Sequence, residues 1–185
     1  MQLIKLQLNQ TDELLQLEED LYWQDKDWND LWRREAKEKF RSFIEDYLTN
    51  FPQGCFGLVD ETEQLVGAMF LIKISKSEPI PYLHRVADYL DKTGQIAYAS
   101  FFVVKRNDQE KEIAQKLYDE AEEIALLKLG CKAVVVVIYS SPLEEEILKR
   151  NNYEKLDKQF EWEIYPGKKV PCFLYHYELL MKEKK

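Results

Sequence analysis

The amino-acid sequence predicts a single α+β (mixed α/β) domain over residues 1–185, with a mostly antiparallel central sheet that contains one parallel pair of strands. The length is that of one domain, and a hydrophobic content of 45% is enough for a buried core. Residues 96–138 read as strand, helix and strand, which predicts a parallel pair joined by a right-handed crossover. The other strand-like runs follow one another through short turns, as antiparallel strands do.

The N-terminal quarter is predicted to form a strand and two helices. Residues 1–8 alternate between apolar and polar side chains, as in a half-buried strand. Thr11 offers an N-cap hydroxyl to a first, leucine-rich helix. A second helix is expected to start near Asp27, because its apolar residues recur three and four positions apart, and to end at residues 51–54, Phe-Pro-Gln-Gly.

A hairpin and an insertion are predicted next. Residues 55–60 and 64–75 are strand-like and are separated by a polar turn, which is typical of a β-hairpin. Gly67 lies inside the second run and predicts a bulge or a close backbone approach. Residues 76–94 are expected to form an insertion that contains a short helix.

The second half is predicted to alternate between strands and helices before a closing hairpin. A buried strand at 96–104 leads into a long helix that Gly130 ends. Residues 132–139, KAVVVVIY, are continuous and β-branched, which predicts a strand buried on both faces. The Ser-Pro pair at 141–142 supplies the cap and first residue of a short helix. Residues 160–180 are expected to form the hairpin.

Charge and composition narrow the classes of partner. The net charge of −8 argues against nucleic-acid binding and is compatible with a cationic small substrate. No apolar stretch approaches the roughly 18 to 20 residues of a membrane span, and the N-terminus does not resemble a secretory signal. No membrane partner is therefore expected.

Cysteines and histidines indicate no metal site. Cys55, Cys131 and Cys172 have no ligand spacing, and His84 and His176 each stand alone in the sequence. The cysteines are expected to be buried thiols of a protein in a reducing, cytoplasmic compartment.

The sequence KRNDQEKEIAQKL, residues 105–117, lies where a strand passes through a polar turn into a helix. The first amides of a helix can bind phosphate groups, so the turn is a candidate site for a phosphate-bearing cofactor. It contains no glycine, however, and it includes Asp108, Glu110 and Glu112. Acidic residues are also what an ordinary first helical turn prefers. The local sequence leaves a phosphate site and an ordinary helix start both open.

Element order, together with residues 104–153, resembles the GNAT acetyltransferase family, which transfers an acyl group from acetyl-CoA to an amine. The pyrophosphate loop of that family, Arg/Gln-x-x-Gly-x-Gly/Ala, is matched here by Gln109, Glu112 and Ala114. The sequence LKRNNYEKL is similar to the family's closing phrase, with Asn152 where glycine is usual. The resemblance implies a GNAT-like sheet with helices on both faces and a parallel pair that splays apart.

The resemblance also implies acetyl-CoA as co-substrate, without a metal, and candidate residues that bind it. The backbone of the fourth strand is expected to hold the pantetheine arm at Phe102, Val103 and Val104. The pyrophosphate is expected at Gln109, Glu110, Lys111, Glu112, Ile113 and Ala114. Ser141 lies near the expected cofactor arm, although a helix cap is the commoner role for such a serine.

Catalytic and acceptor-binding candidates are fewer. Tyr98 is the candidate proton relay, because the fourth strand has no carboxylate to act as a base. Trp28 and Trp32 lie in the first two helices, which cover the acceptor pocket in the resembled family, and indole faces can hold an ammonium group. Packing in the core is the alternative role for all three side chains.

Two departures from the family pattern bear on the chemistry. Glu112 replaces a glycine, and a carboxylate about 6 Å from a phosphate charge opposes binding by about 0.7 to 3 kcal/mol, depending on the local dielectric. Leu148 occupies the position where many family members carry a tyrosine that protonates the leaving thiolate. The first departure is expected to weaken cofactor binding, and the second is expected to alter how the thiolate is protonated.

The predicted function is therefore an N-acetyltransferase that acts on a primary amine of a small molecule or of a protein. One alternative is a catalytically inactive GNAT-like binding or regulatory module, which Glu112 and Leu148 favour. Another is an acyltransferase for a longer acyl chain. A homodimer is compatible with the exposed strand edges of this type of sheet.

Overall fold

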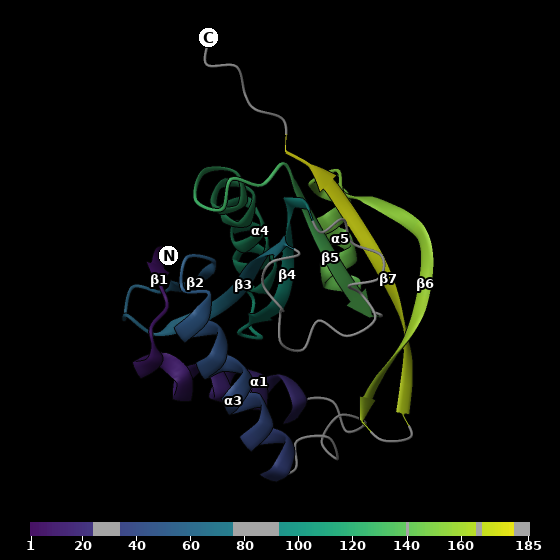
Figure 1. The fold of residues 1–185 in the computed structure, drawn as a ribbon. Helices are drawn as coiled ribbons and strands as arrows, with labels where there is room; N and C mark the ends of the chain where they lie inside the picture. The colour runs from purple at the N-terminus through teal and green to yellow at the C-terminus, as the bar shows by residue number, and fades with distance from the viewer. Residues whose placement is uncertain (24–33, 76–92, 140, 166–167, 180–185) are drawn as a thin grey trace. The chain divides into compact units, whose positions relative to one another are not determined.

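The computed structural model describes residues 1–23, 34–75, 93–139, 141–165 and 168–179 (Figure 1). Its elements follow the predicted order. They are β1 (Gln2–Lys5), the 3-10 turn η1 (Leu8–Gln10), α1 (Thr11–Trp23), α3 (Arg34–Asn50), β2 (Cys55–Val59), β3 (Leu65–Ser75), β4 (Thr93–Val104), α4 (Glu110–Leu127), β5 (Ala133–Tyr139), α5 (Pro142–Arg150), β6 (Glu154–Tyr165) and β7 (Lys168–Glu178).

The described strands form a seven-stranded sheet in the order β1-β2-β3-β4-β5-β7-β6. Strand β2 pairs antiparallel with β1 and β3, and β7 pairs antiparallel with β5 and β6. Strands β4 and β5 run parallel, with residues 96–99 paired to residues 133–136. The predicted fold class is confirmed: a mixed α+β fold with a mostly antiparallel sheet and one parallel pair. Splaying of that pair stays a prediction.

The chain divides into two compact units, which are described separately below. The first contains Met1–Phe70 and Phe101–Leu117, and the second contains Leu71–Ser100 and Tyr118–Lys185. Strands β3 and β4 and helix α4 each contribute residues to both units. A single domain over the whole chain stays a prediction.

The start of α1 differs from the sequence prediction. The Oγ1 of Thr11 donates a hydrogen bond to the carbonyl oxygen of Leu8 at 2.8 Å, instead of accepting one as an N-cap. The Gln7 amide donates to Oε1 of Gln10 at 2.8 Å. Because η1 leads directly into α1, the helical path starts earlier than predicted. Thr11 is consequently a buried residue inside that path.

Two strands also begin earlier than the apolar runs that predicted them. Thr93 and Gly94, assigned to the insertion, belong to β4. Strand β6 begins at Glu154, which pairs with His176 of β7, because backbone pairing does not require apolar side chains. The expected short helix of the insertion and the expected helix start at Asp27 lie outside the described residues.

Helices cover both faces of β3 within the first unit, as predicted. On one face, Phe70 of β3 packs against Phe43 of α3 and Phe101 of β4, with ring centroids 6.2 and 4.7 Å away. Gly67 is three residues from Phe70, and residues an odd number apart in a strand point to opposite faces. A Cβ on Gly67 would lie 2.7 Å from Cγ2 of Ile113 in α4. The predicted close approach at Gly67 is confirmed.

The core of the second unit lies around β5. Val134, Val135 and Val136 are at most 2% exposed, which confirms that this strand is buried on both faces. Val135 packs in a cluster with Ile74, Tyr98 and Leu174. Helix α4 ends before Gly130, whose φ of 64° is the left-handed conformation expected of a helix stop.

Replacing Gly67 by alanine should destabilise the protein by about 1 to 3 kcal/mol, because the added methyl group overlaps Ile113 and must displace α4. Urea unfolding measures this cost. In a matched experiment, Ile113→Ala should cost less in the Gly67→Ala background than in the wild type, because it removes the clashing group. If the destabilisations caused by Gly67→Ala and Ile113→Ala are additive, the added methyl group does not clash with Ile113.

Candidate functional site

The turn between β4 and α4, residues 105–109, is built by backbone and side-chain hydrogen bonds within the first unit. The Lys105 amide donates to the Val66 carbonyl of β3 at 2.8 Å, which holds the chain as it leaves β4. Asn107 then accepts two bonds: its Oδ1 from the Gln109 amide at 2.9 Å, and its carbonyl from the Glu110 amide at 3.1 Å. The Ile113 amide donates to the Gln109 carbonyl at 2.9 Å and starts the helical ladder.

These hydrogen bonds determine which backbone amides at the start of α4 remain available to an anion. A helix leaves its first amides without partners inside the helix, and this end also has a partial positive charge. Here Asn107 already binds two of the amides, those of Gln109 and Glu110. A phosphate that uses the Gln109 amide must replace the Asn107 side chain. The turn is therefore a capped helix start, and its role as a phosphate site stays a prediction.

The side chains proposed for cofactor binding divide into two groups. Val103, Val104, Ile113 and Ala114 are at most 5% exposed, so any contact they make with a cofactor is through the backbone. Gln109, Lys111 and Glu112 are exposed, and Phe102 and Glu110 are half-buried. The exposed carboxylate of Glu112 lies in water, where its repulsion of a phosphate is at the weak end of the predicted range. The roles of all these residues as cofactor ligands stay predictions.

Ser141 and Tyr98 have packing or capping roles within the second unit. Oγ of Ser141 accepts a hydrogen bond from the Glu144 amide at 3.3 Å, which confirms that Ser141 is the N-cap of α5. Tyr98 is 5% exposed and lies in the cluster around Val135. These positions favour structural roles but do not test the predicted ones. Trp28 and Trp32 lie outside the described residues.

The closing phrase of the sequence forms the expected turn after α5. Asn152 has a φ of 59°, the left-handed conformation that explains why glycine is usual at this position in the resembled family. The Tyr153 amide donates to the Leu148 carbonyl at 2.9 Å. Leu148 is fully buried, and because its side chain is aliphatic this position supplies neither a proton nor a hydrogen bond.

The structure adds one titratable residue, Glu144 in the first turn of α5, to those that the sequence predicted. Oη of Tyr118 in α4 donates a hydrogen bond to Oε1 of Glu144 in α5 at 3.1 Å. Burial raises the pKa of the Glu144 carboxyl to about 7. Tyr118 was visible in the sequence as a hydroxyl on the apolar side of a helix, and a buried hydroxyl needs a partner. Its partner could not be read from the sequence.

The three cysteines are buried thiols, as predicted. Cys55, Cys131 and Cys172 are at most 1% exposed and form no disulfide. Burial raises the pKa of the Cys55 thiol to about 12, so this thiol is not a nucleophile at neutral pH.

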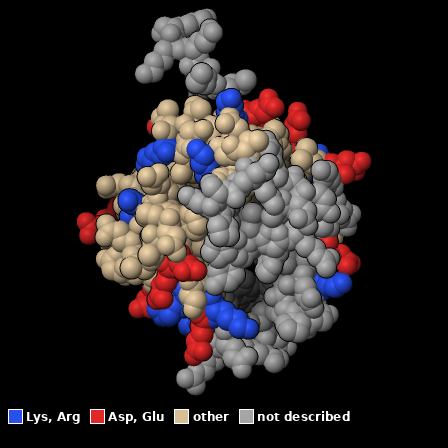
Figure 2. Space-filling view, viewed as in Figure 1, with Lys and Arg blue, Asp and Glu red and all other residues tan. Residues whose placement is uncertain are grey.

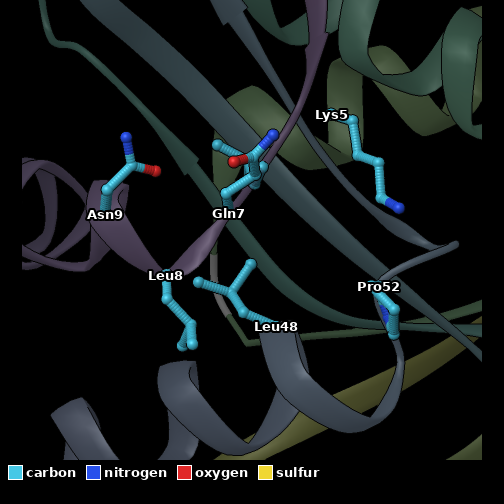
Figure 3. A pocket seen from close by; sticks show the side chains of 7 residues that line it. Lys5, Gln7, Leu8, Asn9, Leu48 and Pro52 are labelled. Atoms are coloured by element: carbon cyan, nitrogen blue, oxygen red, sulfur yellow. The ribbon is translucent and has the colours of Figure 1, made fainter.

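The surface has other features outside the turn. In the first unit, an open pocket of about 400 Å³ lies where β1 meets η1 and the end of α3, and Figure 3 shows Lys5, Leu8 and Leu48 around it. It contains none of the predicted site residues. Figure 2 shows acidic and basic side chains interspersed over the described part of one face.

Within the described parts of the chain, no three His, Cys, Asp or Glu side chains come together as they would around a metal ion. No described helix has the length and apolar composition needed to cross a membrane.

Comparison with known proteins gives a family match and a set of similar structures. The model of the Acetyltransferase (GNAT) family matches residues 15–143. No curated protein matches the sequence. A Staphylococcus epidermidis protein described as a probable acetyltransferase is similar in structure, with 15% identity, 97% of this chain and 99% of that chain covered, and a TM-score of 0.69.

Two further structures are similar over nearly the same length. One is yncA of Salmonella typhimurium with its cofactor acetyl-CoA, at 13% identity, 98% and 95% coverage and a TM-score of 0.64. The other is the spermidine/spermine N-acetyltransferase SpeG of Vibrio cholerae, in mutant forms, at 14% identity, 96% and 94% coverage and a TM-score of 0.62. At these identities the likeness shows a shared fold.

Replacing Asn107 by alanine should destabilise the protein by about 1 kcal/mol, because the Gln109 amide loses its side-chain acceptor at the start of α4. Asn107→Asp is the matched control, since it keeps an acceptor oxygen and adds a charge that suits this end of a helix. Urea unfolding measures both variants. An alanine variant as stable as the wild type would show that Asn107 does not cap α4.

Proposed function

The chain belongs to the GNAT acetyltransferase family, and on this premise we propose that it transfers an acetyl group from acetyl-CoA to a primary amine of a small molecule or of a protein. The observation that carries the proposal is the exposed start of α4 directly after β4, in a chain whose family match covers residues 15–143. The acetyl-CoA recorded in the yncA structure supports the choice of co-substrate.

The donor groups at the turn fit an anionic group. The first amides of α4 and the dipole of the helix favour negative charge, and Arg106 and Lys111 are exposed cationic side chains close by in the sequence. The dipole contributes roughly 0.3 to 1 kcal/mol, and an exposed Glu112 opposes it by about 0.7 kcal/mol at a distance of about 6 Å in water. The two effects are similar in size, so Glu112 weakens an anion site without abolishing it.

The remaining cofactor contacts are proposed on the resemblance. The backbone of Phe102, Val103 and Val104 would hold the pantetheine arm, and the residues from Gln109 to Ala114 would hold the pyrophosphate. Ser141 would contact the cofactor arm with the side of its hydroxyl that the Glu144 amide does not use.

The reaction requires three events. The substrate ammonium loses a proton, the amine nitrogen forms a bond to the thioester carbonyl carbon, and the carbon–sulfur bond breaks to release a thiolate that takes up a proton. Backbone amides that polarise the carbonyl oxygen would supply most of the electrostatic stabilisation. Tyr98 is proposed as the relay for the proton of the amine. Because Leu148 has no acidic hydrogen, the thiolate must take its proton from elsewhere.

The acceptor is proposed to be cationic. The net charge of −8 favours approach of an amine, and a SpeG protein of the same fold is named for spermidine and spermine. Trp28 and Trp32 are proposed to line its pocket. A cytoplasmic location is proposed from the three buried free thiols, and a homodimer is proposed as the assembly.

A second candidate function is a GNAT-like binding or regulatory module without turnover. The buried Leu148 favours it, because no side-chain proton donor exists at that position. Glu112 at the glycine position of the loop favours it as well. An acyltransferase for a longer acyl chain uses the same scaffold and differs only in the acyl pocket.

Calorimetric titration of acetyl-CoA should give a dissociation constant in the micromolar range for the wild type. Glu112→Gln should bind about threefold more tightly, because a repulsion of about 0.7 kcal/mol in water is removed. Glu112→Gly removes the same charge and also opens the backbone, so any further gain over Glu112→Gln measures backbone approach.

The outcomes of this titration separate the candidate functions. Binding with acetylation of at least one amine supports the enzyme. Binding that appears only in the Glu112 variants, or binding without turnover of any amine, supports the module. If neither the wild type nor the variants bind acetyl-CoA, the proposed co-substrate is wrong.

Tyr98→Phe tests the proton relay. If the hydroxyl carries the amine proton, kcat should fall about 100-fold while the affinity for acetyl-CoA stays unchanged, because only the proton path is removed. Steady-state kinetics and the same titration measure the two quantities. An unchanged kcat would leave Tyr98 as a core aromatic with no part in the reaction.

A further inference from the structure

The pocket of the first unit is large enough for a small molecule and contains none of the residues predicted to bind acetyl-CoA or the amine. It lies where β1 passes into η1, opposite the C-terminal end of α3 (Figure 3). Its volume of about 400 Å³ falls within the range of roughly 300 to 1,000 Å³ that is usual for small-molecule sites.

Part of the pocket lining is apolar. Leu48 of α3 is 5% exposed, whereas Leu8 of η1 is 54% exposed. Leu8 and Leu127 are the two exposed large apolar side chains in the described part of the chain. An isolated exposed leucine is common on protein surfaces. A leucine at the edge of a pocket, in contrast, adds apolar area that a bound molecule can cover.

The charge of the pocket lining is positive. Lys5 is its one charged residue among the described residues, although the chain has 34 acidic and 26 basic residues. The Lys5 side chain is exposed and forms no ion pair or hydrogen bond with a described residue. On the neighbouring helices, Asp12 of α1 and Glu45 of α3 both pair with Arg41 instead. The Lys5 ammonium group is therefore available to an anion.

The backbone on both sides of the pocket is held by hydrogen bonds. On one side, the Leu8 carbonyl accepts a bond from Oγ1 of Thr11 at 2.8 Å, which holds η1 against the start of α1. On the other side, the Phe51 amide donates to the Tyr47 carbonyl at 2.9 Å and extends the end of α3. The pocket is thus formed without a ligand, as most small-molecule sites are.

We propose that this pocket binds a small monocarboxylate with an apolar chain, such as a medium-chain fatty acid. The carboxylate pairs with the Lys5 ammonium group, and the chain covers Leu8 and Leu48. In the view of Figure 3, Lys5 and Pro52 lie on one side of the pocket and the two leucines on the other, which suits a ligand with one charged end. A single lysine matches a single negative charge, and it repels a cationic ligand.

Titration of octanoate into the full chain, followed by methyl NMR, tests the proposal. The Leu8 and Leu48 methyl resonances should shift and saturate with a dissociation constant of about 1 mM or lower, while those of Val136 in the second unit stay unchanged. Saturating acetyl-CoA should leave the octanoate affinity unchanged. If the two leucines do not shift, or if the two ligands compete, the proposal is wrong.

Variants of two exposed lysines test the charge. Lys5→Gln should weaken octanoate binding about threefold to fivefold at low salt, because it removes an ion pair at an exposed side chain. Added salt should weaken binding to the wild type more than binding to Lys5→Gln. Lys39→Gln is the matched control, since Lys39 of α3 is exposed but does not line the pocket. It should bind octanoate as the wild type does.

Octylammonium has the same apolar chain as octanoate with the opposite charge. It should bind at least about tenfold more weakly, because Lys5 repels it instead of attracting it. Equal binding of the two probes, or wild-type affinity of Lys5→Gln for octanoate, would overturn the proposal. Lys5 would then be a charge that compensates the C-terminal end of α3, which has no basic residue in its last turn.

Discussion

The first unit depends on two neighbouring residues of β3 that place the start of α4. The Val66 carbonyl accepts the Lys105 amide and so fixes where the chain leaves β4. Gly67, on the next position, lets Ile113 and Leu117 of α4 approach the strand to a distance that a side chain would prevent. One position determines where the turn begins, and the other determines how closely the helix lies on the sheet. The geometry of the candidate phosphate site follows from both.

At the start of α4, Asn107 and an anion would compete for the same backbone amides. Asn107 satisfies the amides of Gln109 and Glu110, so the turn is stable by itself. An anion proposed to bind here would gain the helix dipole and the remaining amide donors, and it would replace the Asn107 side chain only if it used the Gln109 amide. Exposure of Glu112 keeps its repulsion comparable to the dipole term, because water screens a charge that lies outside the protein. If the proposed cofactor binds here, the turn alone would therefore give modest affinity, and contacts to other parts of the cofactor would have to increase it.

Two residues of the second unit that were predicted to act at the site, Ser141 and Tyr98, also have structural roles. Ser141 caps α5, and Tyr98 lies among the side chains that surround β5. Glu144 is different, because its position in the fold makes it costly to ionise while its position at a helix start favours ionisation. The balance between desolvation and the helix dipole leaves its pKa near neutrality, where a small change in surroundings changes its charge.

The sequence was sufficient for the order of elements, the parallel pair, the Gly67 approach and the Ser141 cap. Each of these depends on local patterns: the period of apolar side chains, the conformational range of glycine, or a short side chain before proline. The early starts of β4 and β6 were missed, because strand pairing is made by backbone groups and continues through polar residues such as Glu154. The prediction that Thr11 is an N-cap was wrong, because the 3-10 turn η1 precedes α1 and the Thr11 hydroxyl donates to the Leu8 carbonyl.

By itself, the sequence determined the family pattern and the fold class, because periodicity and turn residues act over a few neighbouring positions. Only the tertiary structure decided which polar groups meet. Tyr118 and Glu144 are 26 positions apart in the sequence. The amide that donates to the Asn107 side chain is determined by the conformation of the turn between β4 and α4. Burial and hydrogen-bond partners arise from how the chain packs. They determine the pKa of Glu144 and which amides at the start of α4 already have an acceptor, and a local sequence pattern predicts neither.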